Sequence, residues 1–464
     1  MEGFAPTSWK QDSSLARWRQ TAVFERLFAP VDTAVLAYFR IAFGLIMLWE
    51  VYRYFDNGWI TRYWVDPVVN FPYYGFGWLR PLPGMGMELL FAGLGVLAIF
   101  IMLGFYYRLS ATLFFLGFTY SFLLEQARYL NHFYLIVLLS FLLIWLPLGR
   151  VYSLDARRAA HGSIQRAPAW TLWLLRAQIG IVYFYAGLAK LNADWFQGEP
   201  MRGWLASRTD FPLIGPFFTE EWLVYAFSYG GLLLDLLIVP FLLWRRTRPF
   251  AFAAGLTFHL MNAKLFSIGI FPWFMIAATA VFFNPDWPRR VIAWLGCACV
   301  LHPPAGPEKR HTSANQPLVV ALLGLYLLVQ LLLPLRHYLY AGDPSWTEEG
   351  HRYAWHMKLR DKDAEATFQV VDAQSGQTWQ VTPEDYLPGW QASKMAAHPY
   401  MIWQFARFLE AEWAEQGVAD VAVYAEVMAS LNGRSPQLLI DPTVDLLTAT
   451  YSIRPSAWIV PLGE

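Results

Sequence analysis

The sequence has 464 residues, of which 56% are hydrophobic, 18% are aromatic and 15% are charged. About a quarter of the residues in a soluble domain are charged, so this composition excludes an ordinary soluble protein and predicts one that crosses a membrane several times. The 35 basic and 35 acidic side chains give a formal net charge of zero, and we therefore expect no nucleic-acid partner.

Apolar stretches long enough to cross a bilayer, about 20 residues each, recur along the first two thirds of the chain. We expect spanning helices at residues 31–52, 87–107, 109–124, 130–148, 170–188, 221–244 and 317–335. The apolar run at residues 249–283 is interrupted at 267–272 and has arginines at both ends, which predicts a helical hairpin that enters the membrane and returns. The expected fold is a polytopic α-helical membrane bundle of about eight or nine transmembrane helices.

The distribution of arginine predicts the orientation, because positively charged loops stay in the cytoplasm. Arginines gather before residue 27, between residues 150 and 166, and between residues 289 and 310. If the N-terminus is cytoplasmic, an odd number of crossings leaves the C-terminus outside. We therefore expect a cytoplasmic N-terminal segment, a transmembrane helical domain and an extracytoplasmic domain, at residues 1–30, 31–336 and 337–464.

After residue 336 the pattern changes to that of an α+β domain. Apolar and polar residues alternate at 353–360 and 366–371, and Ser375-Gly376 precedes a short segment at 378–381, which predicts a β-hairpin. A helical region is expected from residue 382 to about 415. Strands at 419–427 and 437–440 flank Asn432-Gly433, a dipeptide typical of tight hairpin turns.

Lys190 follows directly on an apolar, aromatic stretch. Burial at such a place disfavours the ammonium form, and a neutral lysine amine can act as a base. The alternative is a lysine that extends its amine to the lipid headgroups. Arg176, Tyr183, Gly187 and Lys190 are spaced seven, four and three residues apart, so they share one helix face and predict the wall of a pocket.

Two further charges, Arg40 and Asp235, lie in the middle of expected spanning helices. A charge inside the membrane costs about 2.5 kcal/mol or more unless it is paired. Because buried charges are normally paired, we expect Arg40 and Asp235 to form an ion pair that orders the bundle.

Polar residues also open or line three other expected helices. Asn131 and His132 begin the helix after residue 130, where a lone histidine more often caps or packs than reacts. His259 and Asn262 are three residues apart and therefore neighbours on one face. No HExxH pattern or carboxylate triad accompanies them, so no metal site is expected.

The chain resembles the vitamin K-dependent γ-glutamyl carboxylase family. The resemblance rests on FRIAFG at 39–44, NHFYL at 131–135, VYFYAG at 182–187 with KLNADW at 190–195, and LFSIGIF at 265–271. It continues in the same order from about residue 24 to the C-terminus. The lysine segment and the LFSIG run are specific motifs and not merely apolar.

The resemblance implies an enzyme that oxidises vitamin K hydroquinone with O2 to the 2,3-epoxide. The strong base formed in that reaction removes a γ-proton from a glutamate side chain, and the carbanion adds CO2. Lys190 matches the family's general base, and His132 matches a histidine near the quinone and the glutamate. We also expect quinone contacts from Asn131, His259, Asn262, Tyr183 and Arg176, and glutamate contacts from Tyr353, Trp355 and His356.

The expected cofactor is phylloquinol or menaquinol, with O2 and CO2 as co-substrates and no metal. The expected partners are a glutamate-containing peptide or protein, membrane lipid and the quinone pool. The chain has only Cys297 and Cys299, so the family's luminal disulfide has no counterpart. Two alternatives stay open from the sequence: a quinol oxygenase that forms the epoxide without carboxylating glutamate, and a non-catalytic bundle that binds lipid or quinone.

Overall fold

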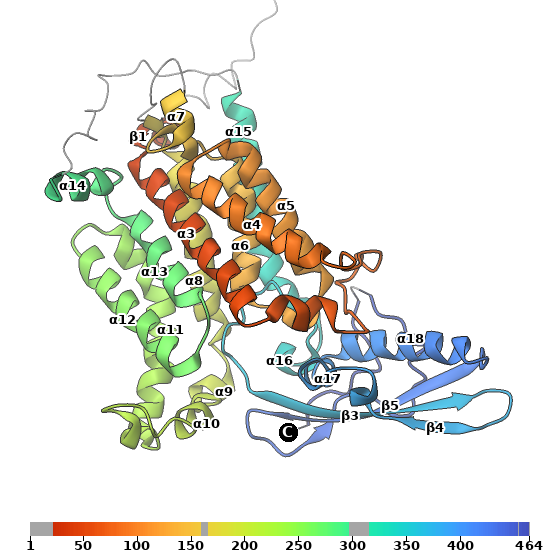
Figure 1. Ribbon diagram of the computed structural model, residues 1–464. Helices are drawn as coiled ribbons and strands as arrows, with labels where there is room; N and C mark the ends of the chain where they lie inside the picture. Colours follow the sequence, from red (N-terminus) through yellow and green to blue (C-terminus); the bar gives the residue numbers. More distant parts are fainter. Residues whose placement is uncertain (1–21, 159–165, 297–314, 453, 464) are drawn as a thin grey trace, which may run out of the picture.

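The computed structural model describes residues 22–158, 166–296, 315–452 and 454–463. Long helices pack side by side in a bundle, and a smaller region of strands and helices is attached at one end of it (Figure 1). The bundle contains α3 (Ala34–Asp56), α4 (Gly86–Leu103), α5 (Tyr107–Leu124), α6 (Asn131–Trp145), α8 (Trp170–Ala189), α11 (Glu221–Leu243), α12 (Arg248–Phe266), α13 (Phe271–Thr279) and α15 (Gln316–Leu332). Short helices flank it: α2 (Ala22–Leu27), α7 (Leu154–Arg158), α9 (Ala193–Phe196), α10 (Met201–Ala206) and α14 (Trp287–Trp294).

Within the described residues, five helices are long and apolar enough to cross a membrane. They are α3, α4, α8, α11, and α15 with its extension to Leu339. Shorter apolar helices lie at Asn131–Trp145 and Phe271–Phe282. Each predicted spanning segment overlaps one of the bundle helices, and the count of eight or nine crossings stays a prediction.

The predicted helical hairpin is present as α12 and α13. Helix α12 ends at Phe266, and α13 begins at Phe271 with Pro272 in its first turn, where a missing amide hydrogen is tolerated. Between them Ser267 and Gly269 have positive φ angles of 48° and 62°, a backbone conformation that ends a helix and reverses the chain. The Gly/Pro break thus turns the chain back beside α12.

The C-terminal region, from residue 337 on, is built on an antiparallel sheet of order β4-β3-β5-β6. Its elements are α16 (Pro344–Thr347), β3 (Lys362–Asp372), β4 (Thr378–Val381), α17 (Gly389–Ala396), α18 (Pro399–Glu415), β5 (Val421–Leu431) and β6 (Gln437–Leu438). The hairpin β3–β4, the helical region and the two later strands agree with the sequence pattern. Asn432 and Gly433 both have positive φ, as the turn between β5 and β6 requires.

The predicted strand at residues 353–360 is wrong. This segment is a run of turns in which Tyr353, Trp355 and Lys358 have positive φ angles of 64°, 60° and 50°. The alternation of apolar and polar residues arises because Tyr353 and Trp355 pack against Tyr134 of α6, at ring-centroid distances of 4.9 and 5.0 Å. The alternation of apolar and polar residues at 353–360 therefore reflects packing against the bundle and not a strand.

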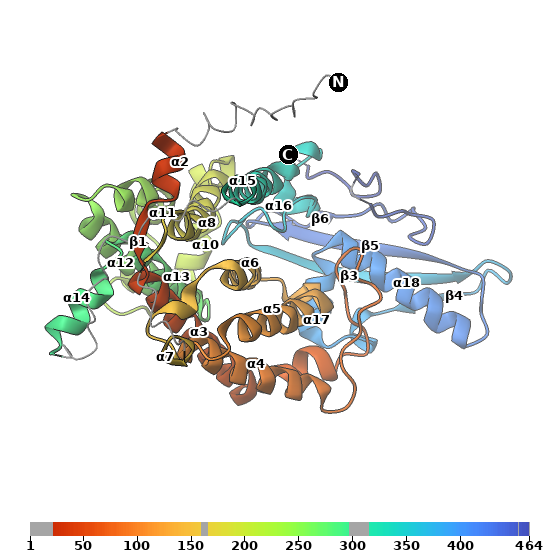
Figure 2. The same ribbon diagram turned by 90° about the horizontal axis from the view of Figure 1, so that it is seen from above.

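Several polar contacts attach the C-terminal region to the bundle, among them those of Gln391 and Asp194. The Gln391 side chain of α17 donates hydrogen bonds to the carbonyl of Val69, at 2.7 Å, and to the Glu125 carboxylate, at 2.9 Å. Asp194 of α9 binds Arg434, in the loop after β5, at 2.6 Å. Figures 1 and 2 show the sheet extending away from α11 and α12, with α17 and α18 on the face of the sheet toward the bundle.

Candidate functional site

A cavity of about 720 Å³ lies among α6, α8, α11, α12 and α13. Most of its wall is apolar and aromatic, including Trp195, Phe258 and Phe271. The wall has few polar side chains: Asn131, His132, Tyr183, Lys190, Asp235, Thr257, His259, Asn262 and Lys358. An apolar pocket with a few convergent polar groups is the usual form of a small-molecule site.

Lys190 and Asp235 form a buried ion pair in the wall of this cavity. Lys190 follows the last residue of α8, and its Nζ donates to Asp235 Oδ2 of α11 at 2.8 Å and to the Ala186 carbonyl at 3.0 Å. Both residues are 5% exposed. The Trp195 ring covers the amine, with Nζ 5.3 Å from its centroid. The amine is therefore buried as expected, but in contact with a carboxylate instead of in a purely apolar setting.

The predicted ion pair between Arg40 and Asp235 is wrong. Arg40 is fully buried in α3, where its Nη2 donates to the Tyr152 carbonyl at 2.5 Å. Asp235 instead pairs with Lys190. The sequence correctly indicated that Asp235 must be paired, but it could not show which helix lies beside α11.

Gly187 brings α8 and α11 close enough for this pair to form. A Cβ at Gly187 would lie 2.7 Å from Leu236 Cδ2 and 3.1 Å from the Leu236 backbone nitrogen. Leu236 directly follows Asp235, so the close approach of the two helices sets the distance between Lys190 and Asp235. The predicted role of Gly187 as part of the pocket wall is corrected: it contacts α11.

We expect Gly187→Ala to destabilise the protein by about 1–3 kcal/mol, because the added methyl group overpacks a contact that includes backbone. Gly93→Ala is the matched control, since a Cβ at Gly93 in α4 would meet nothing within 4 Å. The control should be neutral or slightly stabilised, because alanine is favoured over glycine in helices by about 0.5–1 kcal/mol. The measurement is the thermal unfolding midpoint of each purified variant in the same detergent, compared with that of the unaltered protein. Equal midpoints would contradict this role of Gly187.

Tyr183 and His259 form a second polar pair in the cavity. The Tyr183 hydroxyl and His259 Nε2 lie 2.6 Å apart, which ties α8 to α12. His259 is buried, and its Nδ1 has no hydrogen-bond partner in the described part of the chain. A bound hydroxyl or water is the kind of partner that such a buried nitrogen requires. Asn262, one turn further along α12, lines the same cavity.

Asn131 and His132 line the cavity from the start of α6. The Asn131 side chain accepts from the Tyr129 hydroxyl at 3.0 Å and donates to the His356 carbonyl at 2.9 Å. It therefore connects the bundle to the C-terminal region. The His132 ring lies against Phe133 and Phe271, at centroid distances of 4.6 and 5.7 Å.

Arg176 does not contribute to this cavity, so its expected contact with quinone is corrected. Its Nε donates to the Val281 carbonyl and its Nη2 to the Phe283 carbonyl, both at 3.0 Å. These carbonyls lie at the end of the α13 segment, where a helix leaves acceptors without internal partners. Arg176 shares a helix face with Lys190 but lies several turns away, at the other end of α8.

The three residues expected to contact glutamate lie beside the cavity and not in its wall. Tyr353 and Trp355 pack on Tyr134, and His356 is buried beside two other histidines. The next two residues, Met357 and Lys358, do line the cavity. The expected segment therefore borders the cavity through Met357 and Lys358, and the contacts of Tyr353, Trp355 and His356 with glutamate stay a prediction.

A buried charge cluster that the sequence did not indicate adjoins His356. Its centre is Glu348, which pairs with Arg360 and lies 3.6 Å from both Lys362 Nζ and His398 Nε2. Burial alone would raise the pKa of Glu348, but Arg360 and its other neighbours hold it well below its usual value. Burial lowers the pKa of Lys362 to about 7 and that of His398 to about 3. A low pKa keeps Glu348 ionised as the counter-ion of this cluster.

Comparison with protein families accounts for nearly the whole chain. Residues 28–287 match the HTTM domain, and residues 315–464 match the lumenal domain of vitamin K-dependent gamma-carboxylase. The chain belongs to the vitamin K-dependent gamma-carboxylase family. No solved structure matches it. The resemblance on which the sequence analysis relied is thereby confirmed, and this member of the carboxylase family is an integral membrane protein.

The cavity of this carboxylase-family protein draws on both matched regions. Lys190, Asp235 and His259 belong to the HTTM match, whereas Met357 and Lys358 belong to the lumenal-domain match. Sequence reasoning missed the partnership of Asp235 with Lys190 and the contributions of Trp195 and Lys358. One signal in the sequence could have indicated this partnership. Asp235 is an acidic residue expected within the membrane, and it follows Gly230 and Gly231, small residues that allow another helix to approach closely.

Proposed function

We propose that this protein is a vitamin K-dependent γ-glutamyl carboxylase, with Lys190 as the base. The observation that carries this proposal is the buried Lys190–Asp235 pair in the wall of an apolar cavity of about 720 Å³. A catalytic amine needs to be within reach of its substrate and shielded from bulk water. The family match extends over both the part of the chain that holds the lysine and the part that closes the cavity.

In the ion pair, the Asp235 carboxylate can accept the proton that Lys190 must lose before it acts as a base. Lys190 Nζ and Asp235 Oδ2 share a hydrogen bond of 2.8 Å. Transfer of a proton along this bond leaves a neutral amine and a protonated carboxyl group. The amine then accepts a proton from a hydroxyl group bound in the cavity. In this proposal Asp235 positions the lysine and holds its proton.

The cavity fits a reduced vitamin K in size and in chemistry. Its volume lies within the range of about 300–1,000 Å³ that is usual for small-molecule sites. Aromatic side chains such as Phe258 and Phe271 suit a flat ring and an apolar tail. His259, with its unpartnered Nδ1, and Asn262 would hold the ring oxygens. When bound, the hydroquinone would supply the electrons that reduce O2 and the base that removes the glutamate γ-proton.

His132 is proposed to lie beside the reacting groups, because it lines the cavity from a different helix than Lys190. Lys358 adds a positive charge to the wall contributed by the C-terminal region. A glutamate carboxylate entering from that side would meet this ammonium group. Lys358 is therefore the proposed direct contact of the glutamate carboxylate, in place of Tyr353, Trp355 and His356, which lie beside the cavity.

The proposed orientation places the N-terminal segment (1–30) in the cytoplasm, the helical domain (31–336) in the membrane and residues 337–464 outside. The arginine-rich loops support it. The loop after α3 and the loop after α8 both contact the C-terminal region, through Val69 and Asp194, so these loops lie at the same end of the bundle as that region.

The test is an assay of purified protein in nanodiscs with vitamin K hydroquinone, O2, labelled bicarbonate and a short glutamate peptide. Quinone epoxide and peptide-bound label are measured together. Formation of both products is the expected result. Epoxide without label, across peptides of different sequence, would replace the carboxylase by a quinol oxygenase. Protein that binds quinone but forms neither product would overturn the proposal.

A further inference from the structure

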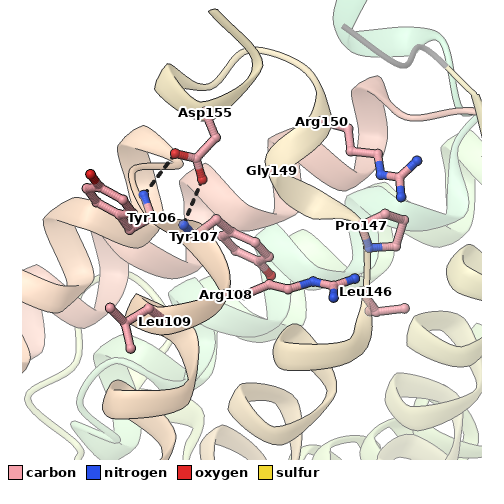
Figure 3. A pocket seen from close by; sticks show the side chains of 9 residues that line it. All are labelled: Tyr106, Tyr107, Arg108, Leu109, Leu146, Pro147, Gly149, Arg150 and Asp155. Atoms are coloured by element: carbon pink, nitrogen blue, oxygen red, sulfur yellow. Dashed lines mark hydrogen bonds between the residues drawn. The ribbon is translucent and has the colours of Figure 1, made fainter. Parts of the chain in front are cut away.

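A second pocket, of about 560 Å³, opens at the end of the bundle opposite the C-terminal region. Figure 3 shows it between the first turn of α5 and the loop that follows α6. Arg108 comes from the helix and Arg150 from the loop, and in this view both guanidinium groups project to the same side of the pocket. Both arginines are exposed, and neither guanidinium group has a hydrogen-bond or ion-pair partner in the described part of the chain.

The wall holds a single carboxylate, Asp155, whose negative charge offsets only part of the positive charge of these arginines. Asp155 accepts hydrogen bonds from the backbone N–H groups of Tyr106 and Tyr107, at 2.9 and 2.8 Å, and so caps the start of α5 (Figure 3). A carboxylate in this position satisfies amides that the helix leaves free. The hydrogen bonds of Asp155 thus go to the backbone, and neither Arg108 nor Arg150 forms an ion pair with it in the described part of the chain.

A third arginine adds positive charge behind the pocket. Arg40 is fully buried, and its Nε and Nη1 have no hydrogen-bond partner among the described residues. It lies directly behind the chain that leads into α5, because a Cβ at Gly104 would collide with Arg40 Nη1. Three guanidinium groups thus face or underlie a pocket with one carboxylate, and such an excess of guanidinium favours a phosphate group.

The surroundings of the pocket favour a phosphate that carries lipid chains. Leu109, in its wall, is 59% exposed, and Trp145, at the end of α6, is 62% exposed. Tyr106 is 60% exposed. Exposed aromatic and aliphatic side chains at the end of a membrane helix are typical of the level of the lipid headgroups. In the proposed orientation this is the cytoplasmic leaflet, in which anionic lipids gather.

We propose that this pocket binds the phosphate group of an anionic phospholipid, with Arg108 and Arg150 as its direct contacts and Arg40 as a buried source of positive charge. The acyl chains would lie along Leu109 and Trp145. The site is independent of the carboxylase proposal, because it shares no residue with the cavity that contains Lys190.

The test uses the full chain in phosphatidylcholine nanodiscs with and without phosphatidylglycerol, and native mass spectrometry counts the retained lipid. Phosphatidylglycerol should be retained by the unaltered protein and bind about thirtyfold more weakly to R108Q/R150Q. R157Q/R245Q is the control, since it removes the same charge from exposed arginines outside the pocket. Retention by R108Q/R150Q, or an equal loss in the control, would overturn the proposal.

A second measurement separates a lipid from a free ion. Thermal unfolding is followed in pure phosphatidylcholine with added inorganic phosphate. The unaltered protein should show no shift in its midpoint. If phosphate raises the midpoint as phosphatidylglycerol does, and R108Q/R150Q removes both effects, the pocket is a site for free phosphate and the lipid proposal is wrong. Equal midpoints of the variants in phosphatidylcholine alone show that they are folded.

Discussion

Lys190→Ala should lower the rate of quinone epoxide formation by about 10²- to 10⁴-fold, the usual contribution of a general base. The same substitution should also destabilise the protein, because it leaves Asp235 buried without its partner. Breaking a buried ion pair by removing one member costs about 3–5 kcal/mol. Loss of activity in this variant alone would therefore not separate catalysis from folding.

The double variant Lys190→Met/Asp235→Leu makes that separation. It removes both buried charges and replaces them by apolar groups, a change that is often neutral or stabilising. We expect a thermal unfolding midpoint close to that of the unaltered protein and epoxide formation as low as in Lys190→Ala. Lys264→Met, which removes an exposed lysine from α12, is the control for charge and should retain activity. Epoxide formation by the double variant would remove Lys190 from the mechanism.

Glu348→Gln should destabilise the C-terminal region by about 3–5 kcal/mol. The side chains of Glu348 and Lys362 are 9% and 3% exposed, so loss of the carboxylate leaves Lys362 and the neighbouring Arg360 buried without a counter-charge. The glutamine amide also brings hydrogen-bond donors toward the donors of Arg360. Because Lys362 is the first residue of β3, the effect should reach the centre of the sheet.

Hydrogen exchange of peptides from residues 362–372 measures this effect, with faster exchange expected in Glu348→Gln. Glu426→Gln is the matched control, because Glu426 is an exposed residue of β5 that faces solvent on the same sheet. A surface change of this kind usually alters stability by no more than about 0.5 kcal/mol. Equal exchange in the two variants would show that Glu348 does not hold this region together.

The helices of the membrane part could be predicted because the bilayer imposes a simple pattern on them. An apolar run of sufficient length, as in α8 or α11, has few other stable forms in lipid. The break between α12 and α13, at Ser267 and Gly269, could also be predicted, because glycine and proline interrupt the apolar run there. The hairpin turn at Asn432-Gly433 was equally clear from its local backbone requirement.

The partners of buried charges could not be predicted, because they depend on which helices are neighbours. Asp235 was expected to pair with Arg40, whereas the close approach of α8 and α11 at Gly187 places it beside Lys190. The segment at 353–360 failed for a similar reason: its alternation reflects contact with Tyr134 of the bundle and not a sheet. Cys297 and Cys299 lie outside the described residues, so their predicted lack of a structural disulfide stays a prediction.

The C-terminal region also forms part of the cavity itself. Met357 and Lys358 line the cavity, and only three residues separate Lys358 from Lys362 at the start of β3. The same segment is tied to α6 by the hydrogen bond from Asn131 to the His356 carbonyl. The boundary between the two matched regions therefore runs through one cavity. A helical half produced without residues 337–464 would have an open cavity, and a ligand that displaces β3 would change the space available beside Lys190.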